Sequence, residues 1–282
     1  MKIRVRMLST MLLTVGCVWA QAPTEAPPVL RITREVVKPG KGAAHDKTES
    51  MFVRAAARAK YPSPYLAMNA VAGPNEVWFL EANASFAAVE KADQAMEAEP
   101  FKTEWQQAST ADGELLSGIS NMIAVFRKDL SYRADQGMAA MPKARYFSVQ
   151  QVCLRQNTEK HLVEIIKWLL TAYGAMNYEQ PIFVYQVLAG APSGTYLVLE
   201  PMASLSAWDN WPAVMKSTRE AMGESAYEQM GKTFAEITQG SVRMLFAINP
   251  KMSYVSKEFA SGDPGFWTPK PPPAHKKAAA AK

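Results

Sequence analysis

The segment Val36-Val-Lys-Pro-Gly-Lys-Gly-Ala-Ala-His45 is matched by Val152-Cys-Leu-Arg-Gln-Asn-Thr-Glu-Lys-His161, 116 residues further along the chain. Three more segments recur in the same order: Asn69–Gly73 as Gln186–Gly190, Phe79–Glu81 as Val198–Glu200, and Leu130–Tyr132 as Met252–Tyr254. The spacing grows from 116 to 122 residues along the chain, as small loop insertions would produce. Because this period is far longer than that of a solenoid repeat, the sequence predicts two small domains of one kind.

Each repeat contains strand-like and helix-like stretches in the order strand, helix, strand, strand, helix, strand. Gly73 and Gly190 mark hairpins, and Ser85 and Ser204 are predicted to cap the helices after the third strands. The expected strands are 30–37, 65–72, 77–80 and 121–127 in the first repeat, and 146–154, 182–189, 195–199 and 242–248 in the second. The main expected helices cover 43–59, 101–116, 158–173 and 205–237.

This order of elements predicts an α+β fold. A βαββαβ unit forms a four-stranded antiparallel sheet with both helices on one face. The strands carry apolar residues on both sides, such as Leu66 and Val71, so each sheet needs cover on both faces. Two units in one chain can cover each other. The modules are expected at 30–134 and 145–260, with a linker at 135–144 between them.

The arrangement resembles the dimeric α/β-barrel superfamily in its fused form, over about residues 30–254. The strand-turn-helix opening, the glycine-bearing hairpin and the strand Trp78-Phe-Leu-Glu81 also resemble the NIPSNAP and antibiotic-biosynthesis-monooxygenase branches. The resemblance implies two tandem ferredoxin-like modules that form an intramolecular dimeric α/β barrel. Members include cofactor-free monooxygenases, haem-binding enzymes, ligand-binding proteins and proteins without known activity, so the fold alone implies no function.

The two ends of the chain differ in composition from the modules. Residues 1–20 have a basic start, an apolar run and the small-residue site Val18-Trp-Ala20, which predicts a secretory signal peptide and a periplasmic or secreted protein. An uncleaved anchor and lipidation at Cys17 are the alternatives. A mobile leader is expected at 21–29. Residues 261–282 are rich in Pro, Lys and Ala, which predicts a disordered tail.

Charge and cysteine content narrow the partners. The formal net charge is +5, but three basic residues lie in the first 20 positions and four lysines lie beyond Ser261, so no basic patch is expected on the body. Nucleic acid is therefore not expected as a partner.

No segment after the signal peptide reaches membrane-spanning length. Cys153 is expected to be a small buried apolar side chain. A monomer or a homodimer fits the sequence equally well.

Polar residues within apolar strands are the candidate ligand-binding residues. By repeat position, Glu35 pairs with Gln151, Asn69 with Gln186, and Asn121 with Arg243. Buried polar groups need partners, so they indicate a ligand cavity or a closed internal network. A site between the two sheets is expected near Asn69, Gln186 and Arg243, and not at His45 or His161. Arg243 would favour a carboxylate or enolate-like group, or would pair with Glu35 or another sheet carboxylate.

His45 and His161 occupy equivalent positions near the start of the first helix of each module. They could be metal or haem ligands or proton shuttles. Since this helix lies outside the barrel, a surface or capping role is favoured. The sequence contains no metal-binding or cofactor-binding motif, so neither a metal nor a cofactor is predicted.

Three functions therefore stay open for an exported protein without assigned catalytic residues. It binds a small apolar or aromatic ligand between the two sheets, it is an enzyme of the cofactor-free monooxygenase or haem type, or it is a structural or interaction protein with a solid barrel. A cavity between the sheets would favour the first two.

Overall fold

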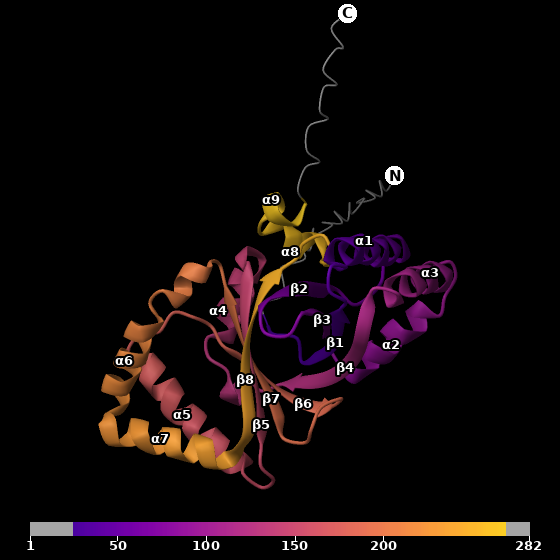
Figure 1. The fold of residues 1–282 in the computed structure, drawn as a ribbon. Coiled ribbons are helices and arrows are strands. Elements are labelled where there is room, and N and C mark those ends of the chain that lie inside the picture. The colour runs from indigo at the N-terminus through magenta and orange to yellow at the C-terminus, as the bar shows by residue number, and fades with distance from the viewer. Residues whose placement is uncertain (1–24, 269–282) are drawn as a thin grey trace, which may run out of the picture.

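A computed structural model describes residues 25–268, which form a closed barrel of eight antiparallel strands in the order β1-β3-β2-β8-β5-β7-β6-β4 (Figure 1). The strands of the first half are β1 (Val29–Val37), β2 (Tyr65–Ala72), β3 (Glu76–Asn83) and β4 (Leu116–Phe126). Those of the second half are β5 (Tyr146–Leu154), β6 (Phe183–Ala189), β7 (Thr195–Met202) and β8 (Thr238–Ile248). The predicted α+β class is confirmed.

Two seams close the barrel, and each joins the first half to the second. β2 pairs with β8, where Asn69 lies opposite Ala247, and β4 pairs with β6, where Val125 lies opposite Gln186. Both seams are antiparallel and both contain a register shift. At the second seam, the backbone of Gly190 has a positive φ of 86° and lies so close to β4 that a Cβ would meet the Asn121 carbonyl oxygen at 1.9 Å. Glycine is therefore required at this point.

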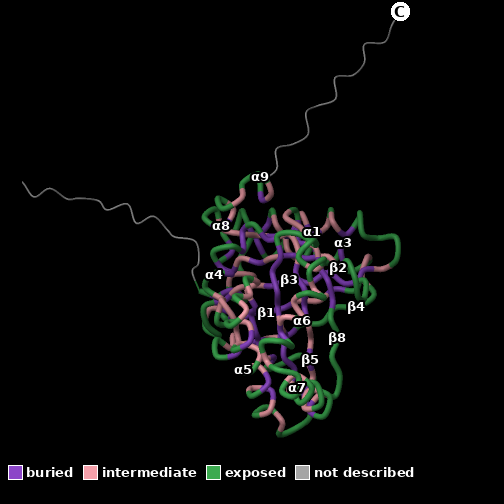
Figure 2. The backbone as a smooth tube through the Cα atoms, turned by 90° about the vertical axis from the view of Figure 1, so that its left-hand side faces the viewer, coloured by how far each residue is buried: buried purple, intermediate pink, exposed green. Residues whose placement is uncertain are grey.

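Helices cover the outside of each half (Figure 1). The first half carries α1 (Gly42–Ala59), α2 (Phe86–Met96) and α3 (Phe101–Gly113), and the second carries α5 (Glu159–Ala175), α6 (Trp211–Met222) and α7 (Glu224–Ile237). Ser85 caps α2 by accepting a hydrogen bond from the Ala88 backbone N–H, as predicted. The helical region expected at 205–237 is broken at Gly223, whose φ is 80°. Figure 2 shows the exposed residues concentrated on these outer elements and the buried ones along the strands.

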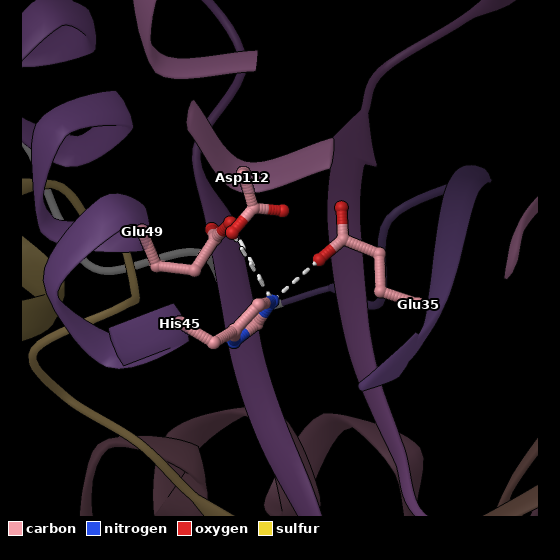
Figure 3. Close-up of side chains that lie close together, drawn as sticks. All are labelled: Glu35, His45, Glu49 and Asp112. Atoms are coloured by element: carbon pink, nitrogen blue, oxygen red, sulfur yellow. Dashed lines mark hydrogen bonds and ion pairs between the residues drawn. The ribbon is translucent and has the colours of Figure 1, made fainter. Parts of the chain in front are cut away.

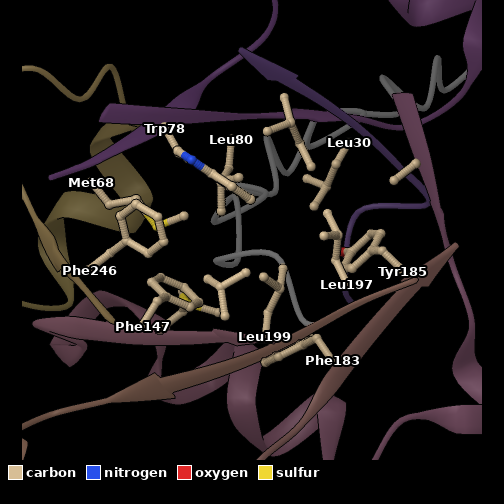
Figure 4. Packing of buried hydrophobic residues seen from close by; sticks show 14 of the residues in the cluster. Leu30, Met68, Trp78, Leu80, Phe147, Phe183, Tyr185, Leu197, Leu199 and Phe246 are labelled. Carbon is tan, nitrogen blue, oxygen red and sulfur yellow. The ribbon is translucent and has the colours of Figure 1, made fainter. Parts of the chain in front are cut away.

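The inside of the barrel is filled by alternate residues of all eight strands (Figure 4). Trp78 and Phe246 pack near its middle with ring centroids 5.2 Å apart, and both are fully buried. An ion pair also faces inward, since Arg34 lies 2.8 Å from Glu76 and stacks on Trp78 at 4.8 Å. Cys153, expected to be buried, is only half-buried.

Short helices cover one end of the barrel (Figure 1): α4 (Ala134–Ala140), the 3-10 turn η2 (Met141–Lys143), α8 (Lys257–Ser261) and α9 (Pro264–Trp267). The linker expected at 135–144 is thus helical, and it buries Met138 and Met141. Residues 25–28 also pack here, with Ala26 buried, and residue 29 already belongs to β1. The leader expected at 21–29 therefore ends earlier than predicted.

The expected start of the disordered tail at Ser261 is wrong for residues 261–268. Trp267 is 6% exposed, its Nε1 donates to the Pro142 carbonyl oxygen at 2.8 Å, and its ring packs edge-on against Phe259. Arg145 forms an ion pair with Asp263. These contacts supply the apolar burial that the composition of the segment did not suggest.

The predicted signal peptide, residues 21–24 of the leader and residues 269–282 of the tail lie outside the described residues. Within residues 25–268, no helix has the length and apolar character needed to cross a membrane.

Candidate functional site

A cleft of about 340 Å³ lies between the outer face of the first four strands and helices α1–α3, and we call it the helix–sheet cleft. Strands β1, β3 and β4, with Tyr65 at the start of β2, form one wall, and the three helices form the other. It is lined by Arg31, Thr33, Glu35, Glu49, Phe52, Tyr61, Tyr65, Phe79, Glu81, Met96, Trp105, Ser109, Ile119 and Asn121.

Strand alternation explains why β1 contributes polar residues to this cleft. Leu30 and Ile32 belong to the barrel core, so Arg31, Thr33 and Glu35 point to the opposite face, toward the helices. The helix side of β1 therefore carries Arg31, Thr33 and Glu35, while the barrel side carries Leu30 and Ile32 with Arg34 as its polar residue.

Aromatic rings from the helices form the apolar part of the cleft. Phe52 of α1 and Trp105 of α3 meet edge-to-face with ring centroids 4.6 Å apart. Tyr61, which follows α1, packs against Phe101 at 5.5 Å. Such a wall suits a flat apolar group.

An ion-paired network lies along the same cleft. Arg31 contacts Glu81 at 2.9 Å and also pairs with Asp93. The Tyr61 hydroxyl accepts from Arg31 Nη2 at 2.9 Å and donates to Glu81 Oε2 at 3.2 Å. Burial is the main cause that raises the pKa of Tyr61, and the nearby Glu81 carboxylate adds to it. The hydroxyl therefore stays protonated over the physiological pH range.

Four buried side chains meet at one end of the cleft: Glu35 from β1, His45 and Glu49 from α1, and Asp112 from α3 (Figure 3). We call them the His45 cluster. His45 Nε2 lies 2.9 Å from Glu35 Oε2, 3.8 Å from Glu49 Oε1 and 3.7 Å from Asp112 Oδ1. His45 is 1% exposed. Glu35 and Glu49 also line the cleft, so the cluster communicates with it.

The electrostatics of the His45 cluster disfavour a fully ionised state. Burial, followed by the negative charges of Glu35 and Asp112, raises the pKa of the Glu49 carboxyl well above its usual range. Burial also raises the pKa of Glu35, against the opposing effect of its hydrogen bond with His45. Thr48 donates a hydrogen bond to Asp112 Oδ1. Three carboxyls thus share one imidazole in a space sheltered from water.

Within residues 25–268, two buried side-chain polar atoms have no hydrogen-bond partner, namely Glu49 Oε1 and the Tyr65 hydroxyl oxygen. Both residues line the helix–sheet cleft. Buried polar atoms are almost always paired in folded proteins. Because both unpartnered atoms belong to residues of one cleft, they are the strongest sign of a ligand site in the described chain.

The expected surface or capping role of His45 is wrong. α1 begins at Gly42, so His45 lies in its first turn and faces the outer side of β1, where Glu35 points out to meet it. A helix outside the barrel still has an inner face packed on the sheet. His161, by contrast, is exposed and lies 3.3 Å from Glu164 on its own helix.

The structure does not bring Asn69, Gln186 and Arg243 together. Each alternates with residues of the barrel core and therefore points away from the barrel interior. Asn69 and Gln186 lie at the two different seams. Asn69 Oδ1 accepts from Asn249 at 3.3 Å, and Gln186 Oε1 accepts from Arg127 at 3.0 Å.

Arg243 lies in the second half, 3.6 Å from Glu200 Oε1, and donates to Gln150 Oε1 at 2.6 Å. It also stacks on Trp211 at 5.3 Å. The expected pairing with a sheet carboxylate is thus present, and the carboxylate is Glu200. Glu35 is instead bound to His45.

The repeat pairing of Glu35 with Gln151 was one residue out of register. Thr33 lies opposite Phe79 and Asn121, and Gln150 lies opposite the equivalent residues, Val198 and Arg243. Each residue of β5 therefore lies 117 positions after its equivalent in β1, whereas His161 lies 116 positions after His45.

Glu35 accordingly corresponds to Val152, and Gln151 belongs to the alternate, inward-facing set of β5. A slip of one residue moves a strand side chain to the opposite face.

The corresponding layer of the second half is filled by apolar side chains. Val152 and Leu154 of β5 pack there against Leu162 and Ile165 of α5, and all four are buried. At these positions the first half therefore has a polar cleft and the second half an apolar core, while Arg243 and Glu200 pair elsewhere on the same face of the second half.

A second cavity, of about 330 Å³, lies at the end of the barrel that the short helices cover. It is lined by Leu30, Leu66 and Leu80 from the first half and by Phe147, Phe183 and Leu199 from the second. Whether a cavity lies between the two sheets was left open by the sequence; this one does, but none of the expected residues Asn69, Gln186 and Arg243 lines it. The hydroxyl of Tyr185 there donates to the Pro27 carbonyl oxygen at 3.1 Å.

No protein-family model matches the sequence, and no curated protein matches it at a significant level. Solved structures match its fold. An anthrone oxidase-like protein superposes with a TM-score of 0.52 at 11% identity, over 83% of this chain and 96% of that chain. A protein described as a monooxygenase, from Fusobacterium nucleatum subsp. nucleatum, superposes with a TM-score of 0.50 at 12% identity, over 79% and 93% of the two chains. The chain therefore shares the overall fold of these two structures.

Proposed function

We propose that this protein binds a small phenol-like molecule of one or two rings in the helix–sheet cleft. The observation that carries the proposal is the pair of unpartnered buried atoms, Glu49 Oε1 and the Tyr65 hydroxyl, in one cleft. Leaving such an atom unpartnered costs about 1–3 kcal/mol. A ligand that supplies the missing partners would recover that free energy on binding.

The chemistry of the cleft selects the ligand class. A hydroxyl on the ligand can donate to Glu49 Oε1 and accept from the Tyr65 hydroxyl at the same time. The ring would pack on Phe52 and Trp105. The cleft volume of about 340 Å³ lies at the lower end of the range for small-molecule sites, roughly 300–1,000 Å³.

The test is a binding screen on the purified chain with one- and two-ring phenols, read by thermal shift and by tryptophan fluorescence. The Tyr65→Phe and Trp105→Leu variants are expected to bind at least about tenfold more weakly, which corresponds to about 1.4 kcal/mol. Tyr178→Phe, in the aromatic cluster of the second half, is the matched control and should bind normally. Equal binding by Tyr65→Phe and Tyr178→Phe would refute a site in this cleft.

A second candidate function is oxidation of the bound ring by dioxygen. It is supported by the fold neighbours above, one described as anthrone oxidase-like and one as a monooxygenase. Oxygen uptake in the presence of each phenol that binds tests it. Binding without oxygen uptake would leave the ligand-binding function alone.

We also infer that the two halves are tandem ferredoxin-like modules of the NIPSNAP and antibiotic-biosynthesis-monooxygenase kind, and that the chain is exported after cleavage before Gln21. The repeated segments and the equivalent strand pairings, such as Thr33 with Asn121 and Gln150 with Arg243, support the first inference. The order of basic, apolar and small residues in 1–20 supports the second. N-terminal sequencing of the protein from its native host tests export, since a mature chain that starts at Met1 would contradict it.

A further inference from the structure

We propose that the His45 cluster is a metal site, in which Glu35, His45, Glu49 and Asp112 hold one divalent first-row transition-metal ion at the inner end of the helix–sheet cleft. This inference shares the unpartnered Glu49 Oε1 with the proposed function, but it does not depend on which ligand the cleft binds.

The geometry of the donor atoms fits one ion. The four potential ligand atoms, one from each residue, all lie within 4.8 Å of one another. Donors at about 2.1 Å from an ion are spaced by about 3.4 Å in a tetrahedron, or by about 3.0 and 4.2 Å in an octahedron. The distances from His45 Nε2 to the three carboxylates, between 2.9 and 3.8 Å, span the same range. Spacings of up to 4.8 Å exceed the largest octahedral donor–donor distance of about 4.2 Å, so the side chains would draw closer together when they bind one ion.

The charge of the cluster calls for a cation. Three carboxyl groups are buried around one imidazole, and no ion pair within residues 25–268 joins any of the three to a lysine or an arginine. Burial of unpaired carboxylates is strongly unfavourable, and metal coordination is one of the ways proteins offset it. An ion of charge +2 would neutralise two of the three carboxylates.

The unpartnered atom is a second and independent observation. Glu49 is 3% exposed, and its Oε1 has no hydrogen-bond partner although it points toward His45 and Asp112 (Figure 3). If the four side chains formed a closed hydrogen-bond network without a metal ion, Glu49 Oε1 would have a hydrogen-bond partner. Thr48, which donates to Asp112 Oδ1, holds that carboxylate in place as an outer partner of a metal ligand does.

The donor set narrows the choice of ion. One imidazole nitrogen with carboxylate oxygens suits Mn²⁺, Fe²⁺, Co²⁺ or Zn²⁺, while Ca²⁺ takes six to eight oxygen ligands. Glu35 and Glu49 line the cleft, whereas His45 and Asp112 do not. A remaining coordination position would therefore face the cleft, where a ligand hydroxyl could occupy it.

The second half provides an internal comparison. Val152 stands at the position equivalent to Glu35, and Ile165, which lies 116 residues after Glu49, is also buried and apolar. His161 is exposed and paired with Glu164 alone. The equivalent layer therefore has no ligand set, so the proposed metal site belongs to the first half only.

The experiment uses the full chain, stripped with a chelator and dialysed. Zn²⁺ and Mn²⁺ are titrated by calorimetry, and Co²⁺ by its visible absorption. The wild-type chain is expected to bind one equivalent of metal, and the Glu49→Gln and Asp112→Asn variants to bind at least tenfold more weakly. The matched control replaces the other two histidines, His161→Gln with His275→Gln, and should bind as the wild type does.

Folding and function are checked separately. The metal-free Glu49→Gln chain should melt no lower than the metal-free wild type, because the neutral amide has nearly the same size as the carboxyl group and costs no more to bury. No stoichiometric binding by the wild type, or unchanged binding by Glu49→Gln, would overturn the metal site. Tyr65→Phe should keep full metal affinity while losing phenol affinity. Phenol binding without any metal binding would overturn this inference and leave the proposed function standing.

Discussion

Replacing Tyr65 with phenylalanine is expected to stabilise the ligand-free protein. The hydroxyl of Tyr65 is buried without a partner, and burial, with the nearby Glu49, raises its pKa well above the usual range. Phenylalanine keeps the ring contacts with Phe79 and Tyr254, whose centroids lie 6.1 and 6.0 Å away. Since a buried unpartnered hydroxyl costs about 1–3 kcal/mol, the free energy of unfolding should rise by about 1 kcal/mol. For a chain of this size, the melting temperature should rise by about 2–4 °C.

Tyr61→Phe is the matched control, because it removes a hydroxyl from the same cleft that has two partners. The Tyr61 hydroxyl accepts from Arg31 and donates to Glu81. Its loss should lower the free energy of unfolding by about 1 kcal/mol. Urea denaturation of both variants, without ligand, measures the two changes. If both variants are destabilised alike, the Tyr65 hydroxyl has a partner in solution, and the reasoning that makes it a ligand contact fails.

Three further predictions concern the rest of the fold. Trp267→Ala should lower the free energy of unfolding by about 3 kcal/mol, whereas the half-exposed Trp168→Ala should cost less than about 1 kcal/mol, as urea denaturation can measure. Burial raises the pKa of Glu200 in the folded state, so its contribution to stability is present at low pH and is lost as the pH rises above about 4.5. As the pH rises above about 4.5, the free energy of unfolding should therefore fall less in Glu200→Gln than in the wild type. An equal fall in both proteins would contradict the raised pKa of Glu200. Gly190→Ala should destabilise the chain by more than about 2 kcal/mol, because its Cβ would collide with β4. Gly231→Ala in α7, which has open space around it, should stabilise the chain by about 0.5–1 kcal/mol in the same assay.

The strand and helix pattern could be predicted from the sequence because it depends on local periodicity. The strand expected at 65–72 is β2 to the residue, and the helix expected at 43–59 differs from α1 by one residue. The short helices over the barrel end could not be predicted in this way. α9 has four residues and forms because Trp267 reaches Pro142, a contact across more than a hundred residues. Tertiary packing, which local propensity does not record, stabilises it.

The candidate site was only partly visible in the sequence. Glu35 and His45 were both noted, but nothing in the sequence placed them against each other. Glu49 had a usable signal, because it follows His45 by four residues on a helix and so shares its face. Asp112 had none, since it reaches the cluster from α3, and only the packing of α1 on α3 brings it there.

The asymmetry between the two halves connects fold to function. Both halves place helices on the outer face of a four-stranded sheet, and the second half fills the layer between them with Val152 and Ile165. The first half has Glu35 and Glu49 at the corresponding places, buried beside His45. Carboxylates in a packed layer lower stability unless they are compensated, and the second half shows that the architecture accepts an apolar layer. The second half buries Glu200 as well, but beside Arg243. The burial of three carboxyls without a lysine or arginine partner in the described part of the chain is therefore a cost specific to the first half, and a ligand or metal ion at the helix–sheet cleft gives that cost a function.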